Sequence, residues 1–112
     1  MADLNYYRQC IEKVLTNYAE YISGSNSPFE TELIFDREHD HYQVIDIGWD
    51  KNQYVFSPVL HFDIKQNHIW FQYNATEFEI VDELLAMGIH KSEIVIGFHS
   101  PNKRKLTEYC AA

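Results

Sequence analysis

The stretch that decides the fold runs from Leu60 to Gly88 and reads LHFDIKQNHIWFQYNATEFEIVDELLAMG. Apolar and polar residues alternate over 60–65 and again over 68–73, which predicts two half-buried β-strands. Gln66 and Asn67 form a two-residue connection between them, and asparagine tolerates the positive φ that such a hairpin turn needs. The alternation predicts an antiparallel hairpin with three cross-strand pairs on one apolar face: Ile64–Ile69, Phe62–Phe71 and Leu60–Tyr73.

The second half of this stretch predicts a capped helix from about 77 to 87. Thr76 and Glu79 have the spacing of a capping box, in which both side chains accept hydrogen bonds from backbone N–H groups at the helix start. Gly88 followed by Ile89 is typical of a Schellman ending, because glycine readily takes the left-handed conformation. The apolar side of this helix consists of Ile80, Val81, Leu84 and Leu85.

The residues before Leu60 predict a helix followed by strands. Apolar residues recur at helical spacing from 4 to 22, with Asp3 as the expected N-cap and Gly24 as a left-handed stop. Strands are predicted at 32–37, 42–49 and 54–65, with a bulge or an edge position at Pro58, because proline cannot donate to a strand ladder.

The predicted fold class is α+β, a single domain over residues 1–112. It comprises an N-terminal helix, an antiparallel four-stranded β-meander, the capped helix and a short extended C-terminal segment. That extended segment is the β-branched run at 94–98, and the residues after Pro101 include the basic cluster Lys103, Arg104 and Lys105.

Charge and composition narrow the functional classes. The chain has 17 acidic and 9 basic residues and a formal net charge of −8. This charge repels phosphate backbones, so we expect no direct nucleic-acid binding, with the basic cluster as the weaker alternative. We find no signal peptide and no apolar run of membrane-spanning length, and therefore expect a soluble cytoplasmic protein with no membrane contact and two reduced cysteines.

The polar face of the hairpin carries the candidate site residues. His61 and Asp63 share this face with His68 and Trp70 of the neighbouring strand. An H-x-D pair with a distant histidine is the spacing of some two-histidine-one-carboxylate iron sites. Any solvated strand shows polar residues at every second position, however, so we interpret the face as solvated or partner-facing and predict no metal site. The alternative is a ligand- or metal-binding, enzyme-like domain whose cleft is lined by these four residues.

Other chemistry is poorly supported by the sequence. His39 and His41 lie in a charged turn and are interpreted as solvated. Cys10 and Cys110 have no recognisable catalytic motif, and the four glycines are scattered rather than gathered in a phosphate loop. We predict no catalytic residue and no cofactor. A tryptophan on a polar strand face indicates a covering layer, so we expect a homodimer through the face bearing Trp70, with the C-terminal segment as the competing cover.

Several motifs together resemble the XisI family, small cyanobacterial proteins known as controlling factors for excision of the fdxN DNA element. The matching pieces are Tyr42-Gln43, Gly48-Trp49, His61-Phe62-Asp63-Ile64, Ile69-Trp70-Phe71-Gln72, Thr76-Glu77, Asp82-Glu83-Leu84, Gly88-Ile89, Ile94-Val95-Ile96-Gly97-Phe98-His99, Pro101, Arg104 and Thr107. The chain departs from the family pattern at Gln66-Asn67 and Asn74-Ala75, where glycine-containing turns are more usual, and at His90, where proline is usual.

The resemblance implies a non-enzymatic accessory protein that acts with an XisH-type, nuclease-like partner in site-specific excision of a DNA element. It supplies no catalytic residue. The residues that we expect at the partner interface are His61, Asp63, His68, Trp70, Gln72 and Arg104.

Overall fold

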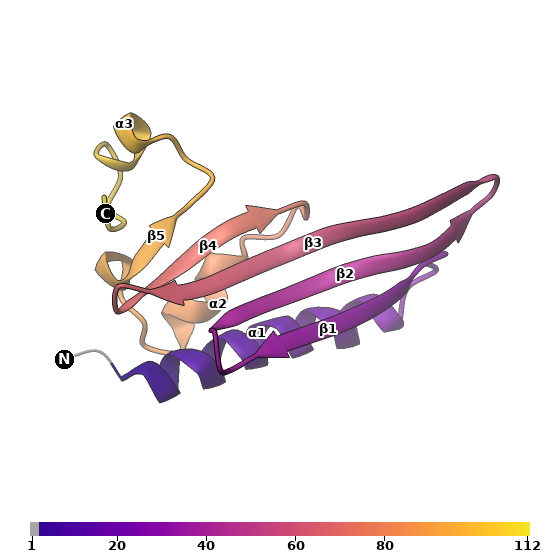
Figure 1. Cartoon of the computed structure of the whole chain (residues 1–112), viewed down its shortest axis with the longest axis horizontal. Helices are drawn as coiled ribbons and strands as arrows, with labels where there is room; N and C mark the ends of the chain where they lie inside the picture. The colour runs from indigo at the N-terminus through magenta and orange to yellow at the C-terminus, as the bar shows by residue number, and fades with distance from the viewer. Residues whose placement is uncertain (1–2) are drawn as a thin grey trace.

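The computed structural model describes residues 3–112 and contains one mixed five-stranded sheet (Figure 1). The strands lie in chain order, and the first four pair antiparallel while the fifth pairs parallel to the fourth. The predicted four-stranded meander is therefore confirmed and extended by one strand. The strands are β1 (Glu30–Asp36), β2 (His41–Asp50), β3 (Gln53–Lys65), β4 (His68–Asn74) and β5 (Ile94–Ile96).

The helices are α1 (Leu4–Ser23), α2 (Ile80–Ala86), the 3-10 turn η1 (Lys91–Glu93) and α3 (Pro101–Arg104). Asp3 caps α1 as predicted, because its carboxylate accepts a hydrogen bond from the Tyr6 N–H at 3.1 Å. Gly24 does end α1, but its φ of −85° shows that the predicted left-handed stop is wrong. The last turn instead tightens through the Gly24 N–H, which reaches the Tyr21 carbonyl at 3.3 Å.

The β3–β4 hairpin confirms most of the predicted register. Ile64 pairs with Ile69 and Phe62 with Phe71, and the two phenylalanine rings stack with centroids 4.4 Å apart. Gln66 and Asn67 both have positive φ, as a two-residue hairpin turn requires. The third predicted pair is wrong, because the register shifts by one residue and Leu60 faces Asn74. The extra residue in β4 is Gln72, which lies between the partners of His61 and Phe62.

Pro58 lies at a bulge and at an edge, as predicted. Ile45 pairs with Pro58 and Val44 with Leu60, so Val59 is the extra residue in β3. β4 pairs with β3 only from Leu60 onward, which leaves Pro58 with a single neighbouring strand.

The start of α2 differs from the prediction. The helix begins at Ile80, and its N-cap residue Glu79 makes no capping hydrogen bond with its side chain. The Thr76 hydroxyl instead donates to Asn74 Oδ1 at 2.6 Å and accepts from the Phe78 N–H at 3.1 Å. These local bonds hold residues 76–78 in a bend outside the helix, so the capping-box prediction is wrong. The Schellman ending is confirmed by Gly88, which has a φ of +91°.

The core lies between the sheet and the pair α1–α2, which lie side by side on one sheet face (Figure 1). Among the core residues on the strands, Tyr42, Val44, Leu60 and Phe62 are fully buried. The end of β2 and β3 at the turn between Asp50 and Gln53 projects beyond α1 and stands clear of the rest of the molecule (Figure 1). We call it the projecting end. Within residues 3–112, no helix has the length and apolarity needed to cross a membrane.

Candidate functional site

Two histidines and an aspartate meet on the sheet face opposite α1. We name this group the His41–His61–Asp63 cluster. One carboxylate oxygen, Asp63 Oδ1, lies 2.7 Å from His41 Nδ1 and 2.7 Å from His61 Nε2. The Gln72 amide donates to the other oxygen, Asp63 Oδ2, at 3.2 Å. Three strands thus contribute to one small polar group, with both oxygens of Asp63 engaged.

Strand register explains how these residues meet. His61 and Asp63 are two residues apart on β3 and therefore share a face. His41 begins β2 and pairs directly with Asp63 across the antiparallel ladder. Gln72 is the extra residue of the β4 bulge, and a bulge commonly re-aims a side chain. The cluster is consequently built by backbone pairing rather than by a loop.

Asp63 is held as a carboxylate by its neighbours. Burial alone raises the pKa of Asp63, but hydrogen bonds from His41, His61 and Gln72 outweigh it and leave the pKa below its ordinary value. The exposed fractions of the side chains are 16% for Asp63, 26% for His61 and 58% for His41. A well-shielded negative charge therefore lies beside two imidazoles that solvent reaches.

The structure brings together three of the six predicted site residues. His61 and Asp63 lie in the cluster and Gln72 donates to it, whereas His68 lies at the hairpin turn with its Nδ1 2.8 Å from the Gln66 carbonyl. Sequence reasoning missed His41, which was interpreted as a solvated turn residue. Aligning β2 against β3 with the bulge beside Pro58 would have placed His41 opposite Asp63.

Trp70 and Arg104, the other predicted site residues, contact each other within the chain. Trp70 is only 8% exposed, with Lys65 Nζ 4.0 Å and Arg104 Cζ 5.3 Å from its ring centroids. Arg104 donates to the Gly97 carbonyl at 3.1 Å and to the Ala112 carbonyl at 3.2 Å, which ties down the C-terminal segment. The expectation that Trp70 offers an open surface is therefore wrong, since the competing C-terminal segment covers it.

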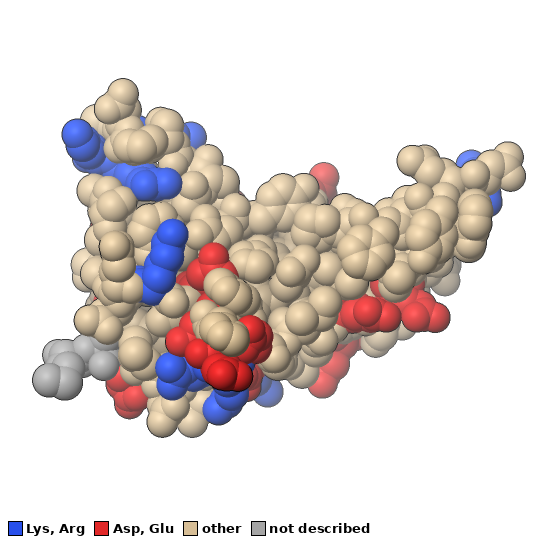
Figure 2. Space-filling model, in the orientation of Figure 1, with Lys and Arg blue, Asp and Glu red and all other residues tan. Residues whose placement is uncertain are grey.

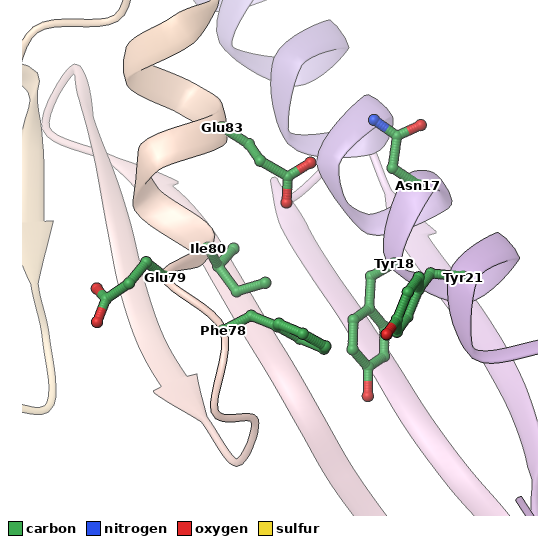
Figure 3. Close-up of a pocket in the computed structure, with 7 residues that line it drawn as sticks. All are labelled: Asn17, Tyr18, Tyr21, Phe78, Glu79, Ile80 and Glu83. Atoms are coloured by element: carbon green, nitrogen blue, oxygen red, sulfur yellow. The ribbon is translucent and has the colours of Figure 1, made fainter. Parts of the chain in front are cut away.

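A second feature is a hollow of about 330 Å³ between α1 and the turn before α2 (Figure 3). The Phe78 ring meets Tyr18 and Tyr21 edge-on, with centroids 6.2 and 5.4 Å away. Glu79 points away from these rings, while Glu83 points toward α1 (Figure 3). None of the seven lining residues is a histidine, cysteine, serine or lysine, and the three aromatic rings make the hollow an aromatic contact surface.

Charge is unevenly distributed over the face seen in Figure 2. Lys and Arg side chains gather over the end that carries α3, and acidic side chains occupy the middle of the molecule and the underside of the projecting hairpin. Further Lys and Arg side chains lie beside the acidic group at the lower edge and at the tip of the projecting hairpin, so on this face the α3 end is basic within a chain whose net charge is −8.

A long helix lying along a mixed sheet, with a parallel edge strand added through a second helix, defines a small α+β protein with a bulged polar sheet face. The chain matches the model of the XisI protein family over residues 1–111 and belongs to this family. This confirms the resemblance seen in the sequence.

Two solved structures are closely similar. A XisI-like protein from Anabaena variabilis ATCC 29413 is 39% identical with a TM-score of 0.90, covering 98% of this chain and 100% of that chain. The fdxN element excision controlling factor XisI from the same organism is 35% identical with a TM-score of 0.83, covering 97% of this chain and 98% of that chain. A search of curated proteins gives no match.

Proposed function

We propose that this protein is an accessory controlling factor in the site-specific excision of a DNA element. The observation that carries the proposal is its similarity to the fdxN element excision controlling factor XisI, at 35% identity over 97% of the chain. The TM-score of 0.83 shows that the two proteins share the same overall fold. The role is that of a cytoplasmic protein that acts through contacts with a partner.

A non-enzymatic role agrees with the chemistry of the candidate nucleophiles. Cys10 is 3% exposed, and burial raises its pKa, which lowers the thiolate fraction available at neutral pH. The aromatic hollow contains tyrosines, a phenylalanine and carboxylates, and its lining residues include no serine, threonine or cysteine that a carboxylate could activate.

The proposed partner is an XisH-type, nuclease-like protein. A net charge of −8 favours a protein partner over direct contact with phosphates. The projecting end of β2 and β3 presents three large aromatic side chains to solvent, with exposed fractions of 63% for Trp49, 53% for Tyr54 and 65% for Phe56. Aromatic residues are enriched in protein interfaces, so this end is the contact surface that we propose.

Co-expression with the XisH-type protein tests this function. We expect the two proteins to co-purify and an excision reporter to require both. The double variant Trp49→Ala/Phe56→Ala should weaken co-purification at least tenfold, since buried aromatic residues dominate interface energies. Tyr73→Ala is the matched control, because Tyr73 is 43% exposed on β4, outside the projecting end. Excision that proceeds equally well without this protein contradicts the proposal.

Self-association stays a prediction. We propose a homodimer. Because Trp70 is covered within the chain, the face that bears it is no longer the surface at which we expect the two copies to meet. Light scattering at tens of micromolar protein tests the dimer, and a monomer throughout that range rejects it. If the projecting end forms the dimer, the double variant should be monomeric while Tyr73→Ala remains dimeric.

A further inference from the structure

The His41–His61–Asp63 cluster has the composition and spacing of a metal-binding group. Each of the three residues offers one ligand atom, and these atoms all lie within 4.8 Å of one another. We propose that His41, His61 and Asp63 bind a divalent transition-metal ion, with Gln72 positioning the aspartate. This inference goes beyond the proposed role in excision and does not depend on it.

The ligand chemistry selects the class of metal. Two imidazole nitrogens and one carboxylate oxygen suit Zn²⁺, Cu²⁺, Ni²⁺ and Fe²⁺. Mg²⁺ and Ca²⁺ prefer shells built entirely from oxygen. The cluster should therefore discriminate against Mg²⁺, and Zn²⁺ and Co²⁺ are suitable probes.

Modest side-chain movement would open the cluster around an ion. The two nitrogens lie 2.7 Å from Asp63 Oδ1. Around a tetrahedral ion with ligand distances near 2.1 Å, neighbouring donor atoms are roughly 3.4 Å apart. The His41 side chain can turn outward to lengthen its distance to Asp63 Oδ1 from 2.7 Å to roughly 3.4 Å, because it is 58% exposed. Each imidazole presents a lone pair to the ion once its proton has passed through solvent to the other ring nitrogen, and Asp63 loses the hydrogen bonds that the two rings donated.

Gln72 acts behind the ligand as a positioning residue. Its amide donates to Asp63 Oδ2 at 3.2 Å, which leaves Oδ1 free to face the two imidazoles. Partners that fix a ligand from behind typically change metal affinity 10–100-fold. Gly97 lies directly behind Gln72, since a Cβ built on Gly97 would come within 2.2 Å of Gln72 Oε1. The amide is therefore confined between β3 and the segment after β5.

The proposed site revises the earlier expectation of no metal. The sequence alternative placed His68 and Trp70 beside His61 and Asp63. Trp70 does pair with Asp63 in the strand register, but its ring packs against Lys65 and Arg104. His68 lies at the hairpin turn, and His41 is the second histidine of the cluster.

In the turn between β1 and β2, His39 Nδ1 lies 3.0 Å from Asp36 Oδ2, and the side chains are 67% and 41% exposed. This pair offers one imidazole where the cluster offers two, which makes His39 a matched control.

Metal titration of the untagged full-length chain tests the inference. We expect calorimetry to show one Zn²⁺ ion per chain and no heat with Mg²⁺. His41→Ala and His61→Ala should each weaken Zn²⁺ binding at least tenfold, Gln72→Leu about tenfold, and His39→Ala less than twofold. Co²⁺ should give a visible absorption spectrum without the intense near-ultraviolet band of a cobalt–thiolate bond.

Three outcomes overturn the inference. They are the absence of Zn²⁺ binding, equal weakening by His39→Ala and His41→Ala, and a thiolate band that assigns the metal to a cysteine. Because His41 is an exposed strand-end residue, His41→Ala should fold normally, and circular dichroism checks this. The test is therefore decisive even if His61→Ala disturbs the sheet.

Discussion

The same two strands build both ends of the β2–β3 ribbon, but the helices cover only one of these ends. At the covered end, Val44 pairs with Leu60 and Tyr42 with Phe62, and all four side chains are fully buried under α1 and α2. At the projecting end, Trp49 pairs with Tyr54 and both are more than half exposed. An isolated two-stranded ribbon is marginally stable in water. Strand pairing thus shapes the whole ribbon, whereas helix cover determines where its stability resides.

The largest expected effect is that of Phe62→Ala at the covered end. Phe62 is fully buried and stacks on Phe71, so its truncation should lower the free energy of unfolding by about 3–4 kcal/mol. Phe56→Ala is the matched control at the projecting end, where we expect a loss of about 0.5 kcal/mol or less. Urea denaturation measures both, and equal losses would break the comparison.

A smaller effect is expected at the ion pair that closes the covered end. Arg8 Nε and Nη2 donate to the two Asp40 oxygens at 2.7 and 3.1 Å, and the Tyr42 hydroxyl donates to Oδ1 at 2.9 Å. Asp40→Asn should cost about 1.5 kcal/mol, and asparagine tolerates the positive φ of 60° found at this position. Asp50→Asn, at the exposed last residue of β2 in the projecting end, is the control and should change stability little.

The same ion pair predicts a pH dependence with a definite sign. Hydrogen bonds from Arg8 keep the pKa of Asp40 below its ordinary value despite partial burial. The stabilisation is therefore complete above the pKa of the unfolded chain, about 3.9, and is lost as the pH falls through the lower folded value. Asp40→Asn should remove this part of the acid loss in urea melts between neutral pH and pH 3. An unchanged acid profile would contradict the assignment.

The smallest effect concerns the projecting end itself. The Trp49 and Tyr54 rings meet edge-on with centroids 5.2 Å apart, and Trp49→Ala should cost only about 0.5–1 kcal/mol. Hydrogen exchange sharpens the comparison, because amides at the projecting end should open locally while those of Val44 and Leu60 exchange only with global unfolding. Equal protection at both ends would show that the ribbon unfolds as one unit.

The sequence predicted the elements well where a single strong pattern governed them. The alternation of 60–65 and 68–73 located the hairpin and two of its three pairs. The third pair failed because Gln72 enters as an extra residue, and alternation carries no mark of a bulge there. The capping-box prediction at Thr76 failed for a related reason. The Thr76 hydroxyl donates to Asn74, and the capping pattern does not include this local bond.

The candidate site was only half predictable. Neighbours two residues apart on one strand, such as His61 and Asp63, can be read from the sequence. His41 joins them only through the β2–β3 register, which depends on the bulge at Val59. The burial of Trp70 depends on the position of Arg104 and the C-terminal segment. Tertiary packing determines that position, and no local sequence pattern predicts it.

The parallel strand β5 has a consequence for folding while the protein is being synthesised. As the chain leaves the ribosome, each of β2, β3 and β4 finds its antiparallel partner already present. The outer edge of β4 has no such partner until α2 and β5 follow, and β5 in turn has its Ile94 carbonyl bonded by the Cys110 N–H at 2.9 Å. Unpaired strand edges are templates for wrong pairing. The nascent protein therefore carries an open edge, and the indole of Trp70, until residues 94–110 have emerged.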